Sequence, residues 1–182
     1  MRLARSMIMS AVAYEISHDW EEPQELQELL VRLREVNPES NTAKIRYAYY
    51  FAERAHTGQT RSSGEPYITH PLAVASILSN LHMDDDTLVA ALLHDVLEDC
   101  EDSMSAEIEE AFGLEVLELV EGVTKLQFKA PSDATARQRA MVETARAAES
   151  LRKMLLAMAK DFRVIIIKLA DRLHNMMTLQ SL

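Results

Sequence analysis

The sequence predicts an all-α fold, and two observations support this prediction. The 182 residues include only four glycines and five prolines, while Ala, Leu, Met, Glu and Arg, which favour helices, are frequent. Apolar residues also recur at spacings of three and four, as they do along one face of an α-helix. A chain of this length fits a single domain with a sizeable core.

The first two predicted helices have recognisable ends. Pro23 suits the first turn of a helix, and that helix ends near Pro38, because a proline disfavours continuation. Asn41 caps the next helix, which ends at Gly58. Their apolar faces contain Leu26, Leu29, Leu30 and Leu33 in the first helix, and Ile45, Ala48, Tyr49, Ala52 and Ala55 in the second.

A loop and two further helices follow. Residues 59–67 include Gly64 and Pro66 and are predicted to form a loop. Pro71 opens a short helix that ends at about Leu81. The acidic run at 84–86 then supplies the cap and the favourable charge for a helix that continues through 89–99.

The last third of the chain is also predicted to be helical. One short amphipathic helix ends at Phe112–Gly113, another runs through 116–123, and a long one runs from Pro131 to about Lys160. The β-branched run at 164–167 suits either a buried strand or a buried helix. Since no second strand is predicted to pair with it, we interpret it as a helix.

Net charge, cysteine content and the lengths of the apolar stretches argue against several classes of protein. The formal charge of −10 argues against non-specific nucleic-acid binding, which needs a basic surface. Cys100 is the only cysteine and permits no intramolecular disulfide, which favours a cytoplasmic location. No stretch approaches the roughly 20 apolar residues of a membrane span, and we interpret the basic, apolar N-terminus as an amphipathic helix rather than a signal peptide.

Two histidines and two aspartates form a candidate metal site. His94 and Asp95 are adjacent within an apolar segment, and His70 and Asp171 also have apolar neighbours. Each residue alone would be interpreted as a surface charge or a satisfied core group. Buried imidazoles and carboxylates are costly unless they are paired or bind a metal, so the combination favours a metal-dependent phosphohydrolase. Ligation by nitrogen and oxygen without thiolate suits manganese, iron or magnesium better than structural zinc.

Glu98 and Asp99 are candidates for orienting or deprotonating the attacking water. On a continuous helix they would share a face with His94 and Asp95, and a carboxylate near a metal can act as a general base. The alternative is an acidic surface at the end of a helix, although acidic charge is unfavourable there.

Five stretches of the sequence carry a family resemblance: residues 55–71, 90–99, 119–126, 152–154 and 163–176. Together they resemble the hydrolase domain of the Rel/Spo (RelA/SpoT homologue) family, whose members make and destroy the alarmone ppGpp. The resemblance extends from about residue 41 to the C-terminus.

The resemblance implies an all-α HD-domain bundle that binds Mn²⁺. It implies an N-terminal helical extension over 1–40 and an HD-type phosphohydrolase domain over 41–182, shortened at its C-terminus and lacking a synthetase domain. The implied reaction is hydrolysis of the 3′-pyrophosphate of (p)ppGpp to GDP or GTP and pyrophosphate. The implied metal ligands are His70, His94, Asp95 and Asp171, with Glu98 and Asp99 activating water.

The same resemblance assigns the nucleotide site. Arg61 matches the residue that packs on the guanine base, which a planar guanidinium can do, and Ser63, Asn175 and Thr178 match residues lining the site. The implied partner is therefore a guanosine tetra- or pentaphosphate, with no nucleic acid and no membrane.

Two alternatives remain open. Met177 stands where the family usually has arginine, and the sequence stops at Leu182, which is compatible with a non-catalytic alarmone-binding module. The same ligand set would also serve an HD phosphohydrolase acting on another nucleotide.

Overall fold

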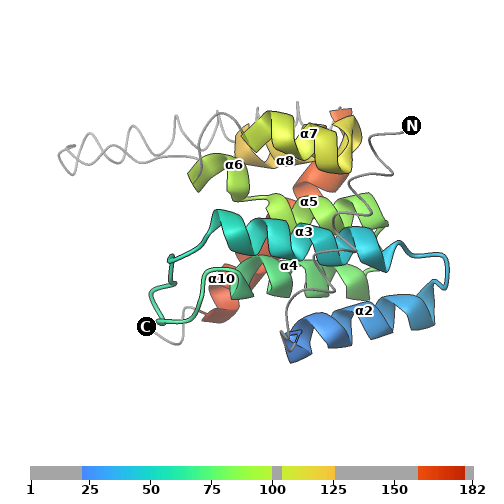
Figure 1. Ribbon diagram of the computed structural model, residues 1–182, viewed down its shortest axis with the longest axis horizontal. Helices are drawn as coiled ribbons and strands as arrows, with labels where there is room; N and C mark the ends of the chain where they lie inside the picture. Colours follow the sequence, from blue (N-terminus) through green and yellow to red (C-terminus); the bar gives the residue numbers. More distant parts are fainter. Residues whose placement is uncertain (1–21, 100–103, 126–159, 179–182) are drawn as a thin grey trace, which may run out of the picture.

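The computed structural model describes residues 22–99, 104–125 and 160–178. Every element longer than a single bridge in these ranges is a helix, which confirms the predicted all-α class (Figure 1). The helices are α2 Gln24–Val36, α3 Thr42–Ala55, α4 Thr69–Asn80, α5 Asp85–Leu93, α6 Val96–Asp99, α7 Met104–Phe112, α8 Leu114–Lys125 and α10 Arg163–Thr178.

Several helix ends lie within about three residues of those predicted. The Asn41 side chain accepts a hydrogen bond from the backbone N–H of Lys44 and so caps α3. Asp84 caps α5 in the same way through the N–H of Thr87. The run at 164–167 is helical, as predicted, within α10. The long helix predicted over 131–160 lies almost entirely outside the described residues, as do residues 1–21.

Helix α5 occupies the centre of the bundle. It packs against α3, α4, α8 and α10, while α2 lies on one side and α7 and α8 lie on the other (Figure 1). Every residue from Thr87 to Leu93 is fully buried. A helix that is apolar on all sides must be surrounded by other elements, and this one anchors the residues that follow it.

The prediction of one continuous helix through 89–99 was wrong. Helix α5 ends at Leu93, a turn contains His94 and Asp95, and α6 begins at Val96. The His94 ring nitrogen Nδ1 lies 2.7 Å from the carbonyl oxygen of Ala91. In a continued helix that oxygen would accept the backbone N–H of Asp95, so the imidazole competes with the helical hydrogen bond.

Helix α10 crosses close to α8 and α5. Gly122 in α8 permits this, because a Cβ atom there would lie 2.7 Å from Cγ2 of Val164. At the start of α10, Arg163 forms ion pairs with Asp161, with Glu115 of α8 and with Asp84, the cap of α5. These contacts fix the position of α10 relative to the central helix.

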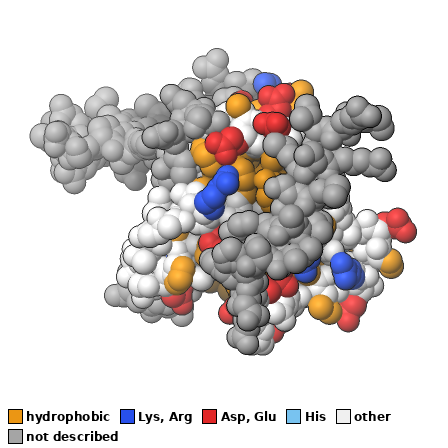
Figure 2. All heavy atoms as spheres, viewed as in Figure 1, with side chains coloured by type: hydrophobic (Ala, Val, Ile, Leu, Met, Phe, Trp, Pro, Cys, Tyr) orange, Lys and Arg blue, Asp and Glu red, His pale blue; other side chains and the backbone are white. Residues whose placement is uncertain are grey.

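The surface in Figure 2 mixes charges of both signs. On this face the basic and acidic side chains of the described residues are interspersed and form no continuous basic tract. Within the described ranges, no helix is long and apolar enough to span a membrane.

Candidate metal centre

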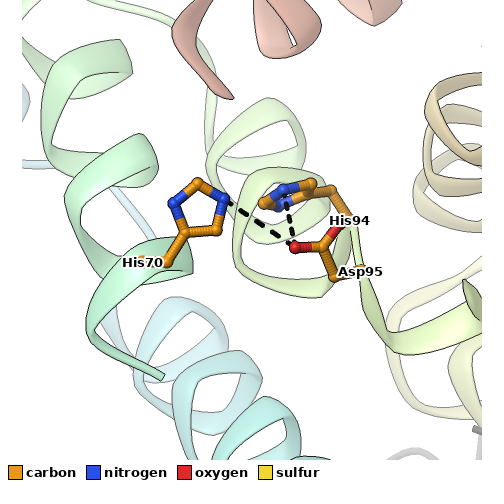
Figure 3. Close-up of side chains that lie close together, drawn as sticks. All are labelled: His70, His94 and Asp95. Atoms are coloured by element: carbon orange, nitrogen blue, oxygen red, sulfur yellow. Dashed lines mark ion pairs between the residues drawn. The ribbon is translucent and has the colours of Figure 1, made fainter. Parts of the chain in front are cut away.

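Three parts of the fold bring the four predicted ligands together. His70 lies in the first turn of α4, His94 and Asp95 form the turn between α5 and α6, and Asp171 lies in the middle of α10. All four side chains are buried. Figure 3 shows His70, from α4, and His94, from the turn after α5, approaching the same oxygen of Asp95.

The distances define a compact cluster. His70 Nε2 lies 3.3 Å from Asp171 Oδ1 and 3.8 Å from Asp95 Oδ2, and His94 Nε2 lies 3.2 Å from Asp95 Oδ2. Possible ligand atoms of His70, His94 and Asp95 all lie within 4.8 Å of one another. One cation could therefore contact these three residues, while Asp171 lies outside this group and contacts it through Nε2 of His70.

The orientation of His94 fits a cation. A carbonyl oxygen can only accept a hydrogen bond, so the proton of neutral His94 lies on Nδ1, which donates to Ala91. Its other nitrogen, Nε2, then carries a lone pair and faces the Asp95 carboxylate. This buried atom has no hydrogen-bond partner in the described part of the chain. Two facing sets of lone pairs repel each other unless a proton or a metal ion lies between them.

Neighbouring groups hold both carboxylates in their charged form. The Tyr67 hydroxyl donates to Asp95 Oδ2 over 2.7 Å. Asn175 Nδ2 donates to Asp171 Oδ1 over 2.6 Å, and Lys168 Nζ lies 2.7 Å from Asp171 Oδ2. Burial alone would raise the pKa of each aspartate, but the nearby histidines, together with Tyr67 for Asp95 and Lys168 for Asp171, lower it well below the usual range.

The histidines respond differently to this environment. Burial lowers the pKa of His70 despite its contact with Asp171. Burial would also lower the pKa of His94, but the adjacent Asp95 carboxylate outweighs it and the pKa is raised. Burial together with the charges of His70 and Arg61 lowers the pKa of His174 to about 4, so this ring is neutral near pH 7.

A cavity of about 380 Å³ opens onto the cluster. Its lining includes three of the candidate ligands, all but His94, together with polar and basic residues of the 59–67 loop and of α10. The lining residues are Thr60, Arg61, Ser62, Tyr67, His70, Asp95, Lys168, Asp171, Arg172 and Asn175.

The predicted nucleotide-site residues lie in different environments. Arg61 and Asn175 line the cavity and are hydrogen-bonded to each other over 3.0 Å. Ser63 lies outside the lining and its hydroxyl is 3.4 Å from a Glu65 carboxylate oxygen. Thr178 also lies outside the lining, and its hydroxyl donates to carbonyl oxygens within its own helix.

The structure places the backbones of Glu98 and Asp99 in α6, directly after the turn that contains His94 and Asp95. Their side chains lie outside the described atoms. Their predicted role in activating water therefore stays a prediction.

Lys168 contacts a candidate ligand in a way that the sequence analysis did not identify. A signal for this contact exists in the spacing along α10, because Lys168, Asp171, His174 and Asn175 are separated by three or four residues and share one helix face. Lysine at such a position is usually exposed, but here it is buried beside Asp171.

The fold and the cluster define a class of protein. An all-helical bundle that buries two histidines and two aspartates beneath a polar cavity has the features of a metal-binding helical domain. A family model described as "HD domain" matches residues 48–182. The chain belongs to the HD-domain family, in which this buried cluster indicates a site for a divalent metal ion.

Known proteins sharpen the assignment. The chain is 53% identical over 148 residues to the bifunctional (p)ppGpp synthase/hydrolase SpoT of Escherichia coli, covering 80% of this chain and 19% of that protein. It is 47% identical over 157 residues to a probable GTP pyrophosphokinase of Mycobacterium leprae, covering 86% of this chain and 18% of the relative. The chain thus spans about a fifth of the length of these relatives.

A solved structure shows a similar fold. It is described as "A metazoan ortholog of SpoT hydrolyzes ppGpp and plays a role in starvation responses". It matches with a TM-score of 0.54 and 32% sequence identity, over 76% of this chain and 71% of that one. The resemblance to Rel/Spo hydrolase domains inferred from the sequence is therefore confirmed.

Proposed function

We propose that this chain is a divalent-metal-dependent hydrolase that removes the 3′-pyrophosphate of (p)ppGpp. In this reaction water cleaves the bond between the ribose 3′-oxygen and the pyrophosphate group. The 3′-oxygen gains a proton, pyrophosphate gains the hydroxyl, and the other product is GDP or GTP.

One observation carries the proposal. Arg61 and Asn175 line the same cavity as His70, Asp95 and Asp171 of the buried cluster. A nucleotide held by the first two residues would therefore present its phosphates to the cluster. The names of the relatives, which include a (p)ppGpp synthase/hydrolase and a ppGpp-hydrolysing metazoan protein, support this substrate.

We propose Mn²⁺ as the ion. Two imidazole nitrogens and two carboxylate oxygens without thiolate suit Mn²⁺, Fe²⁺ or Mg²⁺ better than structural Zn²⁺. Held by His70, His94, Asp95 and Asp171, such an ion supplies Lewis acidity toward phosphate oxygens and an activated water.

Other residues of the chain have separate roles in this proposal. The planar Arg61 guanidinium packs on the guanine base, and Asn175 orients the nucleotide. Lys168 and Arg172, which line the cavity, offset the negative charge of the phosphates. Glu98 and Asp99, which lie in α6 directly after the turn with His94 and Asp95, orient the attacking water or accept its proton. Ser63 and Thr178 reach the nucleotide only if the loop and the helix end adjust on binding.

Pyrophosphate release from ppGpp tests the proposal. We expect release with Mn²⁺, none with EDTA, and a loss of more than about 100-fold in the Asp95→Asn variant, which removes a charged ligand rather than a supporting group. Asp86→Asn is the matched control, since Asp86 forms only a partly exposed pair with Lys44 and should leave turnover unchanged. Turnover by Asp95→Asn at the wild-type rate would contradict the metal assignment.

The same assay separates the two alternatives. Tight binding of ppGpp in the presence of Mn²⁺ with no product would identify a non-catalytic binding module, for which the exposed Met177 in place of arginine is the motivating feature. Hydrolysis of other nucleotides but not of ppGpp would identify an HD phosphohydrolase of different specificity.

We also propose the cytoplasm as the location of the protein and residue 41 as the start of its hydrolase domain.

A further inference from the structure

His174 of α10 lies against His70, a candidate metal ligand, and is not part of the cavity lining. Its Nδ1 is 2.7 Å from Nδ1 of His70, and the two rings are tilted by 32° with centroids 5.0 Å apart. The same His174 nitrogen lies 3.2 Å from NH1 of Arg61, the residue proposed to contact the base. Nδ1 of His174 thus contacts both Arg61, which lines the cavity, and His70, a candidate metal ligand.

The contact with Arg61 fixes the direction of the hydrogen bond between the two histidines. A guanidinium group has only donors, so the His174 nitrogen that it contacts must be an acceptor. The proton between the two histidines then belongs to His70 Nδ1, which donates to His174.

This direction decides which nitrogen of His70 is available. With its proton on Nδ1, neutral His70 carries its lone pair on Nε2, the atom that lies 3.3 Å from Asp171 and 3.8 Å from Asp95. His94 has the same arrangement, since its Nδ1 donates to Ala91. In their neutral form, which metal ligation requires, both imidazoles therefore turn an unprotonated Nε2 toward the carboxylates.

We propose that His174 is a positioning residue that fixes the tautomer and ring orientation of His70 for metal binding. The backbone carbonyl of Ala91 performs this function for His94, and a side chain performs it for His70. The proposal rests on the metal-binding part of the proposed function and is independent of which nucleotide is cleaved.

Nitrogen-15 NMR of histidine-labelled wild-type protein saturated with diamagnetic Mg²⁺ at pH 8 tests the tautomer directly. The His70 signals, identified by their loss in His70→Gln, should show a protonated Nδ1 and an unprotonated Nε2. A proton on Nε2, on that nitrogen alone or on both, would overturn the proposal. This experiment needs no variant of His174 and no substrate.

Calorimetric Mn²⁺ titration tests the consequence. We expect His174→Leu to weaken Mn²⁺ binding about 10–100-fold, as other losses of a supporting hydrogen bond do. His174→Asn should stay close to wild type, because its Oδ1 can accept from His70 in place of Nδ1. His82→Asn, at an exposed histidine outside the site, controls for incidental binding of metal to histidine.

The results of the titration are distinguishable from a failure of the hydrolase proposal. Circular dichroism in EDTA verifies that each variant is folded before titration. Equal Mn²⁺ affinity of His174→Leu and wild type, or equal losses in the folded Leu and Asn variants, would refute a positioning role. Wild-type protein that binds Mn²⁺ normally but cleaves no ppGpp would leave this inference standing and remove only the proposed substrate.

Discussion

Helices α5 and α10 both position residues of the candidate metal centre, but they do so in different ways. Helix α5 is buried on every side from Thr87 onward and contributes its ligands only where it ends. Helix α10 is buried on one face, where Lys168 and Asp171 lie, and exposes Leu169, Leu173, Met176 and Met177 on the other. Helix α5 is thus a core helix with candidate ligands directly after its end, and α10 is an amphipathic helix with a candidate ligand on its buried face.

The difference shows how the two halves of the site are held. After α5, a backbone carbonyl orients His94, so the fold itself fixes the ligand. On α10, side chains three and four residues from Asp171 hold it: Lys168 and Asn175 contact its two oxygens. We therefore expect substitutions in α5 to affect stability most, and substitutions on the inner face of α10 to depend on the metal.

The largest expected effect on stability belongs to the central helix. Leu92→Ala removes a fully buried side chain from α5 and should lower the free energy of unfolding by about 2–5 kcal/mol. Leu173→Ala, on the half-exposed face of α10, is the matched control and should change it by less than about 0.5 kcal/mol. Urea denaturation measures both, and similar losses would refute the contrast between the helices.

A metal-dependent effect is expected on the inner face of α10. Lys168→Met leaves the buried Asp171 carboxylate without its cation, which should cost about 2–3 kcal/mol of unfolding free energy in EDTA. Saturating Mn²⁺ should reduce this loss, because the bound ion compensates the same charge. Lys44→Met breaks a more exposed pair and is the control. A loss that is the same with and without Mn²⁺ would contradict this account.

The smallest expected effect on stability concerns Asp84, which caps α5 and forms an ion pair with Arg163 at the start of α10. Burial would raise its pKa, but hydrogen bonds from Thr87 and the charge of Arg163 lower it. The ionised carboxylate therefore stabilises the fold above the ordinary aspartate pKa of 3.8, and this contribution is lost as the pH falls further.

Two variants of Asp84 separate its cap from its charge. Asp84→Ala should cost about 1 kcal/mol at pH 7, and Asp84→Asn, which keeps a capping oxygen, should cost less. The difference between wild type and Asp84→Ala should shrink in urea denaturation near pH 3. A difference that grows on acidification would show that the sign is wrong.

Most of the described helices were predictable because their signals are local. Pro23, Asn41 and Asp84 mark helix starts, and the periodic apolar residues between them mark buried faces. The break after Leu93 was not predictable, because the apolar pattern continues through it. At this break the His94 ring contacts the carbonyl oxygen of Ala91. That contact depends on the rotamer of His94, which the sequence pattern does not reveal.

The candidate site was predictable in part for a similar reason. Histidine and aspartate in apolar segments stand out, so His70, His94, Asp95 and Asp171 were singled out before the fold was known, and the structure brings them together. Lys168 did not stand out, since a single lysine in a helix is ordinary, and the position of His174 against His70 depends on the approach of α10 to α4.

Anomalous X-ray scattering from crystals of the protein grown with Mn²⁺ tests the central claim most directly. The account predicts one strong manganese peak per chain, at bonding distance from Nε2 of His70, Nε2 of His94 and the carboxylates of Asp95 and Asp171. A fully occupied manganese site elsewhere, with this cluster empty, would contradict it.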